Sequence, residues 1–239
     1  MALKDHIPNS ITSLNLVSGG LGIYFTLMLS PAVGALFMGA AAVFDFADGF
    51  AARLLHAKST IGKELDSLAD VISFGLLPGI ILVKLIAGTV NMPSVQVNGI
   101  EILPFVGLFM AVFAALRLAK FNLDTRQTDS FLGLPTPASG LLIASLPLIL
   151  EYSGSNVLNT AFSGILYNFY FYPVLIAILC WLNVSEIPLL AMKFNSVSIK
   201  KNFRQYLLIA IALVSAALFG FSAVPVVFLS YIAVSLVLK

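Results

Sequence analysis

Long apolar runs recur along this chain, and they constrain its fold more than any other feature. Hydrophobicity delimits eight of them, at about residues 11–30, 32–55, 64–88, 102–122, 136–151, 160–183, 205–220 and 222–238. Runs of roughly 18 or more apolar residues are typical of transmembrane helices, because a helix satisfies its own backbone hydrogen bonds in lipid. The runs are continuous rather than alternating, which argues against a membrane β-barrel. The sequence therefore predicts an all-α integral membrane protein with about eight transmembrane helices.

Composition argues against a soluble protein of the same length. The chain is 59% hydrophobic and 10% charged, so too few polar residues remain to cover a soluble core. Its net charge of +2 is too small to indicate nucleic acid as a partner. The single cysteine, Cys180, excludes an intrachain disulfide, and we expect it to be a packed apolar residue. We expect one transmembrane domain over residues 1–239.

The basic residues give an independent test of the predicted spans. If the N-terminus is cytoplasmic, all of the 13 lysines and arginines except Lys84 fall on the cytoplasmic side. This asymmetry follows the positive-inside rule and supports eight spans with both termini in the cytoplasm. We expect a multi-pass protein of the cell (inner) membrane. The last two segments are short, so a helical hairpin that does not cross fully is the alternative for them.

An acidic window interrupts this apolar chain. The stretch "FDFADGFAARLLHAKSTIGKELDSLAD" (44–70) holds Asp45, Asp48, Asp66 and Asp70, four of only 11 acidic residues. The first two are three apart and the last two are four apart, so each pair lies on one face of its own helix. The two helices are consecutive and can be antiparallel neighbours, which lets the acidic faces meet at the cytoplasmic edge. Carboxylates at membrane depth are costly and indicate function.

Divalent cations are the simplest means of neutralising the repulsion between four carboxylates that face each other. Oxygen ligands suit Mg²⁺ or Mn²⁺, and four negative charges match two divalent ions. Two-metal sites recur in displacement at phosphorus. One alternative is that some of these aspartates only cap helix ends, as Asp66 near the start of its helix would. The other is an ion pathway in a transporter, although the cluster at one membrane edge argues against it.

The residues between the two acidic pairs fit a phosphate ligand. Gly49 and Gly62 remove side chains where a ligand must approach the backbone closely. Ala52 keeps the same region narrow. Arg53 can reach phosphate oxygens with its planar guanidinium, and Ser59 offers a hydroxyl near the turn.

The window as a whole resembles the signature of the CDP-alcohol phosphotransferase family. It reads Asp-x2-Asp-Gly-x2-Ala-Arg-x8-Gly-x3-Asp-x3-Asp, with every fixed position of that signature filled. The resemblance implies a membrane enzyme, usually a homodimer, with a six-helix core, here about residues 7–185 followed by an additional helical pair at about 203–239. Such an enzyme moves a substituted phosphate from a CDP-alcohol to an acceptor alcohol and releases CMP.

The resemblance also implies roles for individual residues. Asp45, Asp48 and Asp66 hold two divalent cations, Mg²⁺ or Mn²⁺, and Asp70 is both a ligand and the general base. The CDP-diacylglycerol-binding residues are Asn9, Gly49, Ala52, Arg53, Ser59 and Gly62.

Four further stretches resemble one branch of that family, which transfers the phosphatidyl group of CDP-diacylglycerol to L-serine. They are "IPNSITSLNLVSGG" (7–20), "LDSLADVISFGLLPG" (65–79), "RLAKFN" (117–122) and "FLGLPTPAS" (131–139), and the resemblance covers roughly residues 7–140. The implied substrates are CDP-diacylglycerol and L-serine, in a membrane lipid environment. A sibling enzyme that uses glycerol 3-phosphate or inositol phosphate is the first alternative, and a non-enzymatic ion-coupled carrier is the second.

Residues for the acceptor are expected on the same cytoplasmic side. The candidates are Arg117, Lys120, Asn122 and Arg126, of which the cations would bind the acceptor's carboxylate. Ordinary positive-inside charge is the alternative for these cations. Lys120 stands where the branch has arginine, so bidentate binding is lost there. The sequon "NVS" (183–185) lies near the cytoplasmic end of the sixth segment, which argues against glycosylation.

Overall fold

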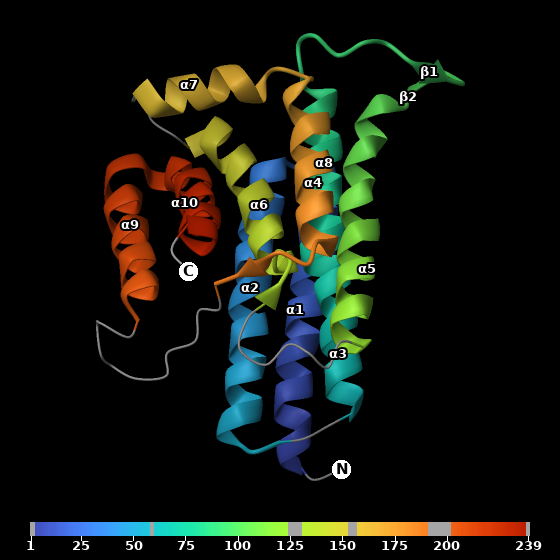
Figure 1. Cartoon of the computed structure of the whole chain (residues 1–239). Helices are drawn as coiled ribbons and strands as arrows, with labels where there is room; N and C mark the ends of the chain where they lie inside the picture. Colours follow the sequence, from blue (N-terminus) through green and yellow to red (C-terminus); the bar gives the residue numbers. More distant parts are fainter. Residues whose placement is uncertain (1–2, 58–59, 124–130, 153–156, 191–201, 238–239) are drawn as a thin grey trace.

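The computed structural model describes residues 3–57, 60–123, 131–152, 157–190 and 202–237. The first half contains α1 (Leu3–Met28), α2 (Pro31–Leu54), α3 (Thr60–Asp70), the π-helix η1 (Val71–Leu76), α4 (Leu77–Ala87), the 3₁₀-helix η2 (Leu103–Leu108) and α5 (Phe109–Leu123). The second half contains α6 (Thr136–Tyr152), α7 (Val157–Leu166), α8 (Phe171–Val184), α9 (Phe203–Phe219), the 3₁₀ turn η3 (Gly220–Ser222) and α10 (Ala223–Val237). Figure 1 shows a helical bundle with no closed sheet, as the sequence predicts.

Five helical runs in the described residues have the length and composition of membrane spans. They are His6–Met28, Pro31–Leu54, Ile61–Ala87, Leu103–Leu123 and Phe203–Val237, and the bent pair α7 and α8 makes a sixth if it is counted as one span. This total is lower than the eight expected segments for two reasons. α6 has only 17 residues, and the last run counts once although it contains two helices.

The sixth expected segment, 160–183, is not one straight helix. α7 and α8 meet at an angle of 93°. Figure 1 shows α7 lying across the end of the bundle, while α8 runs along its axis. The break is stabilised by Asn168, whose side-chain oxygen accepts a hydrogen bond from the backbone N–H of Tyr170 at 3.0 Å. Asn91 holds the same turn from another part of the chain, because its Oδ1 accepts from the N–H of Phe169 at 2.8 Å.

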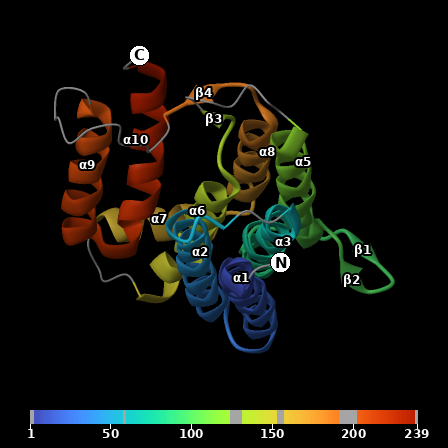
Figure 2. The same ribbon diagram turned by 90° about the horizontal axis from the view of Figure 1, so that it is seen from below.

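The first two helices pack closely and form the scaffold of the acidic window. α2 begins after Ser30, whose hydroxyl accepts a hydrogen bond from the N–H of Val33, and Pro31 occupies the first turn, where proline is favoured. At Gly34 there is no room for a side chain, since an added Cβ would lie 2.9 Å from the carbonyl oxygen of Gly22 on α1. Figure 2 shows α1, α2 and α3 together at the end of the bundle that carries the N-terminus.

The apolar core lies deeper in the bundle, among α2, α4, α5, α6 and α8. Met38, Phe74, Met110 and Ile143 are fully buried there. Cys180 is also buried and contacts the sulfur of Met110, so the prediction of a packed cysteine is confirmed.

Two short antiparallel strand pairs connect the helices. β1 (Gln96–Val97) and β2 (Ile100–Glu101) form a hairpin over Asn98 and Gly99. β3 (Phe131–Leu132) pairs with β4 (Pro188–Leu189), and this pair ties the start of α6 to the end of α8. The β3–β4 pair lies near the C-terminal ends of α5 and α8, between α8 and α10 in Figure 2.

α9 and α10 form a hairpin beside α6, as Figures 1 and 2 both show. Gly220, with φ of +56°, makes the turn between them. Helices of 17 and 15 residues are about 25 Å and 22 Å long, which is shorter than the hydrocarbon core of a typical bilayer. An apolar cavity of about 470 Å³ lies within the hairpin, between α9 and α10, and Ala138 of α6 and Tyr231 of α10 contribute to its wall.

Candidate active site

The two acidic pairs of the window face each other. Ligand oxygens of Asp45 and Asp48 on α2 and of Asp66 on α3 all lie within 4.8 Å of one another. Asp48 is 6% exposed and the other two are partly buried. Atom Oδ2 of Asp48 is buried and has no hydrogen-bond partner among the described residues. This arrangement leaves three carboxylates that no basic side chain of the described chain neutralises by an ion pair.

Asp70 completes the cluster from the last residue of α3. Its carboxyl group approaches that of Asp45 within hydrogen-bonding reach, but it lies outside the close group of three. The Nδ2 group of Asn15 donates a long hydrogen bond of 3.4 Å to Oδ1 of Asp70. The hydroxyl of Ser73 in turn donates to the backbone oxygen of Asn15 at 3.0 Å. α1 therefore fixes Asp70 at the point where α3 passes into a π-helix, a distortion frequent at functional sites.

A cavity of about 260 Å³ opens beside the aspartates. Its walls come from α1, from α2 and its C-terminal end, and from α3, and consist of Pro8, Asn9, Thr12, Asp48, Gly49, Ala52, Ala57, Gly62, Lys63 and Asp66. The structure thus brings together four of the predicted CDP-binding residues: Asn9, Gly49, Ala52 and Gly62. Two of the predicted metal ligands share the same wall.

Gly49 leaves open space in this wall. A Cβ added there would meet only the Nη1 atom of Arg53, at 3.6 Å, and no backbone atom. The glycine is therefore not required for packing, unlike Gly34, and its missing side chain leaves room for a ligand. Arg53 is exposed one turn away on α2, with its guanidinium near this wall. Ser59 lies outside the described residues.

The basic residues predicted to bind the acceptor have different surroundings in the structure. Arg117 of α5 is 7% exposed, interacts electrostatically with Asp70, and has its guanidinium carbon 5.7 Å from the ring centre of Phe121. Lys120 instead forms an exposed ion pair of 3.0 Å with Glu186. Arg126 lies outside the described residues. Of the two described cations, Arg117 is the one that interacts electrostatically with Asp70.

Asn122 holds α5 against α3. Its Nδ2 group donates to the hydroxyl of Ser67 at 2.8 Å, and its backbone oxygen accepts from Lys63 at 3.3 Å. Asn122 is therefore placed as a link between two helices of the site rather than as an open ligand for an acceptor.

Sequence reasoning missed three polar residues at this site. Thr12 lies beside Asp48, Asn15 holds Asp70, and Lys63 lines the cavity. A signal for the first two was present, because Asn9, Thr12 and Asn15 recur at intervals of three on a helix predicted to be apolar.

Comparison with known proteins agrees with this geometry. The family model described as CDP-alcohol phosphatidyltransferase matches residues 5–185, which extends the similarity beyond the expected limit near residue 140. The chain is 34% identical over 146 residues to a CDP-diacylglycerol–serine O-phosphatidyltransferase of Bacillus subtilis, covering 59% of this chain and 75% of the relative. It is 31% identical over 218 residues to the protein of the same name from Mycobacterium tuberculosis, covering 88% of this chain and 69% of that one.

An archaeal relative has a related name. The archaetidylserine synthase of Methanothermobacter thermautotrophicus is 34% identical over 152 residues, covering 62% of this chain and 60% of the relative. The matched region of the family model contains all four aspartates and every residue of the cavity beside them. On these grounds the chain belongs to the CDP-alcohol phosphatidyltransferase family, a family of membrane enzymes.

Proposed function

We propose that this protein transfers the phosphatidyl group of CDP-diacylglycerol to the hydroxyl of L-serine, giving phosphatidylserine and CMP. The observation that carries the proposal is a cluster of aspartates that borders a cavity of about 260 Å³, together with the buried Arg117, which interacts electrostatically with Asp70. The names of the relatives support serine as the acceptor. The archaeal relative, whose name specifies an archaetidyl product, supports the same acceptor with a different donor lipid.

The aspartates fit a divalent-metal site. Three carboxylates meet within 4.8 Å, one of their oxygens is buried without a partner, and a set of oxygen donors alone suits Mg²⁺ or Mn²⁺. Asp45, Asp48 and Asp66 would hold the ions, and Asp70 beside Asp45 would be the fourth ligand. Two such ions, when bound, supply charge neutralisation and alignment for the diphosphate of the donor.

The cavity residues would bind the CDP part of the donor. Gly49 and Gly62 leave the wall open to a phosphate, and Lys63 and Arg53 offer cations at its rim. Asn9 offers an amide for the nucleotide. The site lies where α1, α2 and α3 extend toward one end of the bundle, which lets the headgroup reach water while the acyl chains remain in lipid.

Asp70 and Arg117 would act on the acceptor. Asp70, which accepts a hydrogen bond from Asn15, would accept the proton of the serine hydroxyl as the oxygen attacks phosphorus and CMP leaves. Arg117 interacts with Asp70 and would bind the serine carboxylate, which positions the hydroxyl for attack. A single buried guanidinium suits a carboxylate better than the doubly charged phosphate of glycerol 3-phosphate or inositol phosphate.

The proposal includes the surroundings of the site. The protein spans the membrane several times, and the basic residues favour the cell (inner) membrane with the aspartates and both termini on the cytoplasmic side. We also propose one catalytic domain over the whole chain and a homodimer, both on the basis of the family resemblance.

The test is CMP release by the purified protein in detergent with CDP-diacylglycerol and Mg²⁺ or Mn²⁺. Serine, glycerol 3-phosphate and inositol phosphate are supplied in parallel. We expect release that requires serine and metal, is lost in Asp70→Asn, and is retained in the matched control Glu64→Gln, an exposed carboxylate on the same helix. Release with another acceptor would overturn the choice of serine. No release with any acceptor, in folded protein, would favour the ion-coupled carrier.

A further inference from the structure

Outside the aspartate cluster and Asn15, three helices carry buried polar groups that have no hydrogen-bond partner within the described residues. Asn183 at the end of α8 is 1% exposed, and neither its Oδ1 nor its Nδ2 atom makes a hydrogen bond within the described residues. The hydroxyl of Thr136 at the start of α6 is fully buried and equally unpaired. So is the Nε atom of Arg117 on α5. Unpaired buried polar groups are rare because each costs free energy, so this set requires an explanation.

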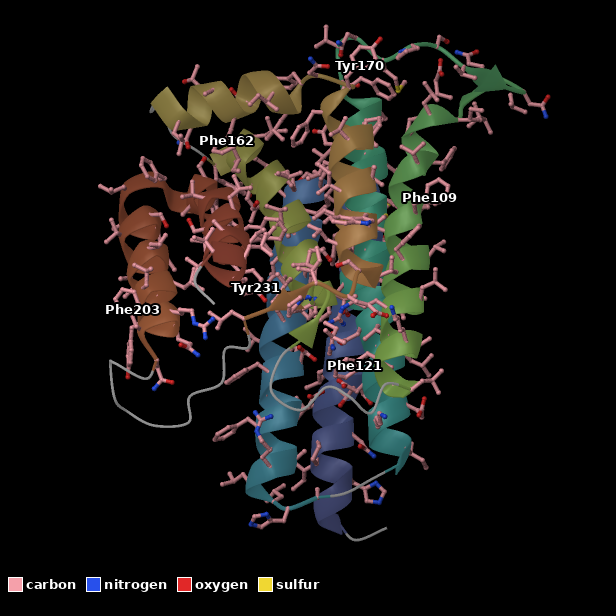
Figure 3. The ribbon with its side chains drawn as sticks, in the orientation of Figure 1. Phe109, Phe121, Phe162, Tyr170, Phe203 and Tyr231 are labelled. Atoms are coloured by element: carbon pink, nitrogen blue, oxygen red, sulfur yellow. The ribbon has the colours of Figure 1, made fainter. Side chains whose placement is uncertain are left out.

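The helix segments that carry these groups meet at one place in the bundle. The Nζ atom of Lys120 lies 3.4 Å from the backbone oxygen of Val184, which brings the last turns of α5, including Arg117, against the end of α8. The N–H of Leu134 donates to the backbone oxygen of Leu182 at 2.9 Å, which brings the start of α6, including Thr136, to the same place. Figure 3 labels Phe121 at the lower end of α5, one helical turn beyond Arg117, whose guanidinium lies over the Phe121 ring.

The place adjoins the aspartate cluster on its interior side. Arg117 interacts electrostatically with Asp70 of α3 and with Tyr231 of α10. The cavity that holds Gly49 and Lys63 lies among α1, α2 and α3, and no residue of α5, α6 or α8 lines it. Asp48 and Asp66 therefore border a cavity of about 260 Å³, and Asp70 interacts with Arg117, which belongs to the unpaired set.

We propose that Asn183 and Thr136 bind the amino group of an amino-acid acceptor. The inference rests on the proposed function and adds to it the residues that recognise the acceptor. A zwitterionic amino acid needs a cation for its carboxylate and neutral oxygens for its ammonium group, and Arg117 with the Asn183 and Thr136 oxygens supplies both. Its side-chain hydroxyl then points to Asp70. Acceptors without an ammonium group leave the two oxygens unpaired and are rejected.

Isosteric apolar variants separate binding from structure. Asn183→Leu and Thr136→Val remove the polar atoms and keep the volume. Because those atoms have no partner within the described fold, we expect unchanged or higher thermal stability. The KM for serine is expected to rise about tenfold to a hundredfold, as for loss of a hydrogen bond to a charged group, while the KM for CDP-diacylglycerol stays the same. The matched control is Ser145→Ala on α6, a buried serine that bonds only to Leu142 of its own helix.

A second measurement uses the wild-type protein and does not depend on how the variants fold. 3-Hydroxypropanoate is serine without its amino group. We expect it, as a competitor of serine, to bind at least about tenfold more weakly than serine does. In Asn183→Leu this difference should shrink, because the partner of the amino group is gone.

The outcomes distinguish this inference from the proposed function. Serine-dependent CMP release in the wild type with an unchanged KM for serine in both variants would overturn the inference and leave the function standing. Lower thermal stability of Asn183→Leu, with an equal loss of activity toward both substrates, would also overturn the inference, because Asn183 would then have a structural role. No serine-dependent release in the wild type would overturn the proposed function itself.

Discussion

Replacing Gly133 with alanine is expected to displace the β3–β4 pair and to weaken acceptor binding. Gly133 has φ of +75°, a backbone conformation that glycine adopts readily. A Cβ added there would lie 2.6 Å from the carbonyl oxygen of Ser185, 3.0 Å from that of Asn183 and 3.1 Å from that of Leu182. The segment must therefore move away from the end of α8, which carries the proposed acceptor residue.

The cost has two parts that can be separated. The left-handed conformation costs a non-glycine residue about 1–2 kcal/mol. Displacement also weakens two backbone hydrogen bonds, from Gly133 N–H to Ile187 O at 3.0 Å and from Leu134 N–H to Leu182 O at 2.9 Å, each worth about 0.5–1.5 kcal/mol. Gly99 has nearly the same φ, +78°, but an added Cβ would meet nothing within 4 Å. Gly99→Ala is therefore the matched control that carries only the conformational cost.

Thermal unfolding in detergent measures the difference. For a chain of this length, 1 kcal/mol corresponds to about 2–4 °C in Tm. We expect a fall of roughly 10 °C in Gly133→Ala and of roughly 4 °C in Gly99→Ala, together with a raised KM for serine in the first alone. Equal falls in the two variants would refute the reasoning, because they would mean that the contacts with the end of α8 contribute nothing.

Three further predictions concern the site itself. Gly49→Val should fold normally, since an added Cβ meets only the Nη1 atom of Arg53, at 3.6 Å. Its side chain fills the cavity, so we expect kcat/KM to fall more than about a hundredfold. Wild-type activity in this variant would show that the cavity is not used. Asn15→Leu should lower kcat about tenfold by releasing Asp70, with little change in either KM. Lys120→Gln should change the KM for serine by less than about fivefold, because an exposed ion pair such as that with Glu186 is worth about 0–1 kcal/mol. A tenfold rise in this KM would instead support the predicted role of Lys120 in binding the acceptor.

The aspartate cluster was predictable because its geometry is nearly local. Intervals of three and four place each pair on one helical face, and a short connection makes the two helices neighbours. The spacing alone therefore predicted that Asp45, Asp48 and Asp66 meet, and the structure confirms this meeting. The open wall at Gly49 followed from the same stretch, because the glycine lies next to Asp48 on the helix that borders the cavity.

The break between α7 and α8 was not predictable from hydrophobicity. Averaged hydropathy reports whether a segment is apolar and does not report its direction. The bend depends on Asn168 and on Asn91, a residue 77 positions earlier, whose side chains hydrogen-bond each other at 3.1 Å. A long-range contact of this kind leaves no periodic signal in the chain, so the segment 160–183 read as one span.

The meeting of the segments that carry the proposed acceptor residues could not be predicted from the sequence for the same reason, because these residues are far apart along the chain. Arg117, Thr136 and Asn183 are isolated polar residues on three separate helices, and each alone is explained by charge bias, a helix start or a chance sequon. The structure adds that all three carry buried polar atoms without a partner in the described residues, on helix segments that meet. The aspartates and the cavity beside them are built from α1, α2 and α3, whereas these groups come from α5, α6 and α8. Because the two sets lie on different elements, changes in the second set should alter which acceptor reacts while leaving metal-dependent use of the CDP donor intact.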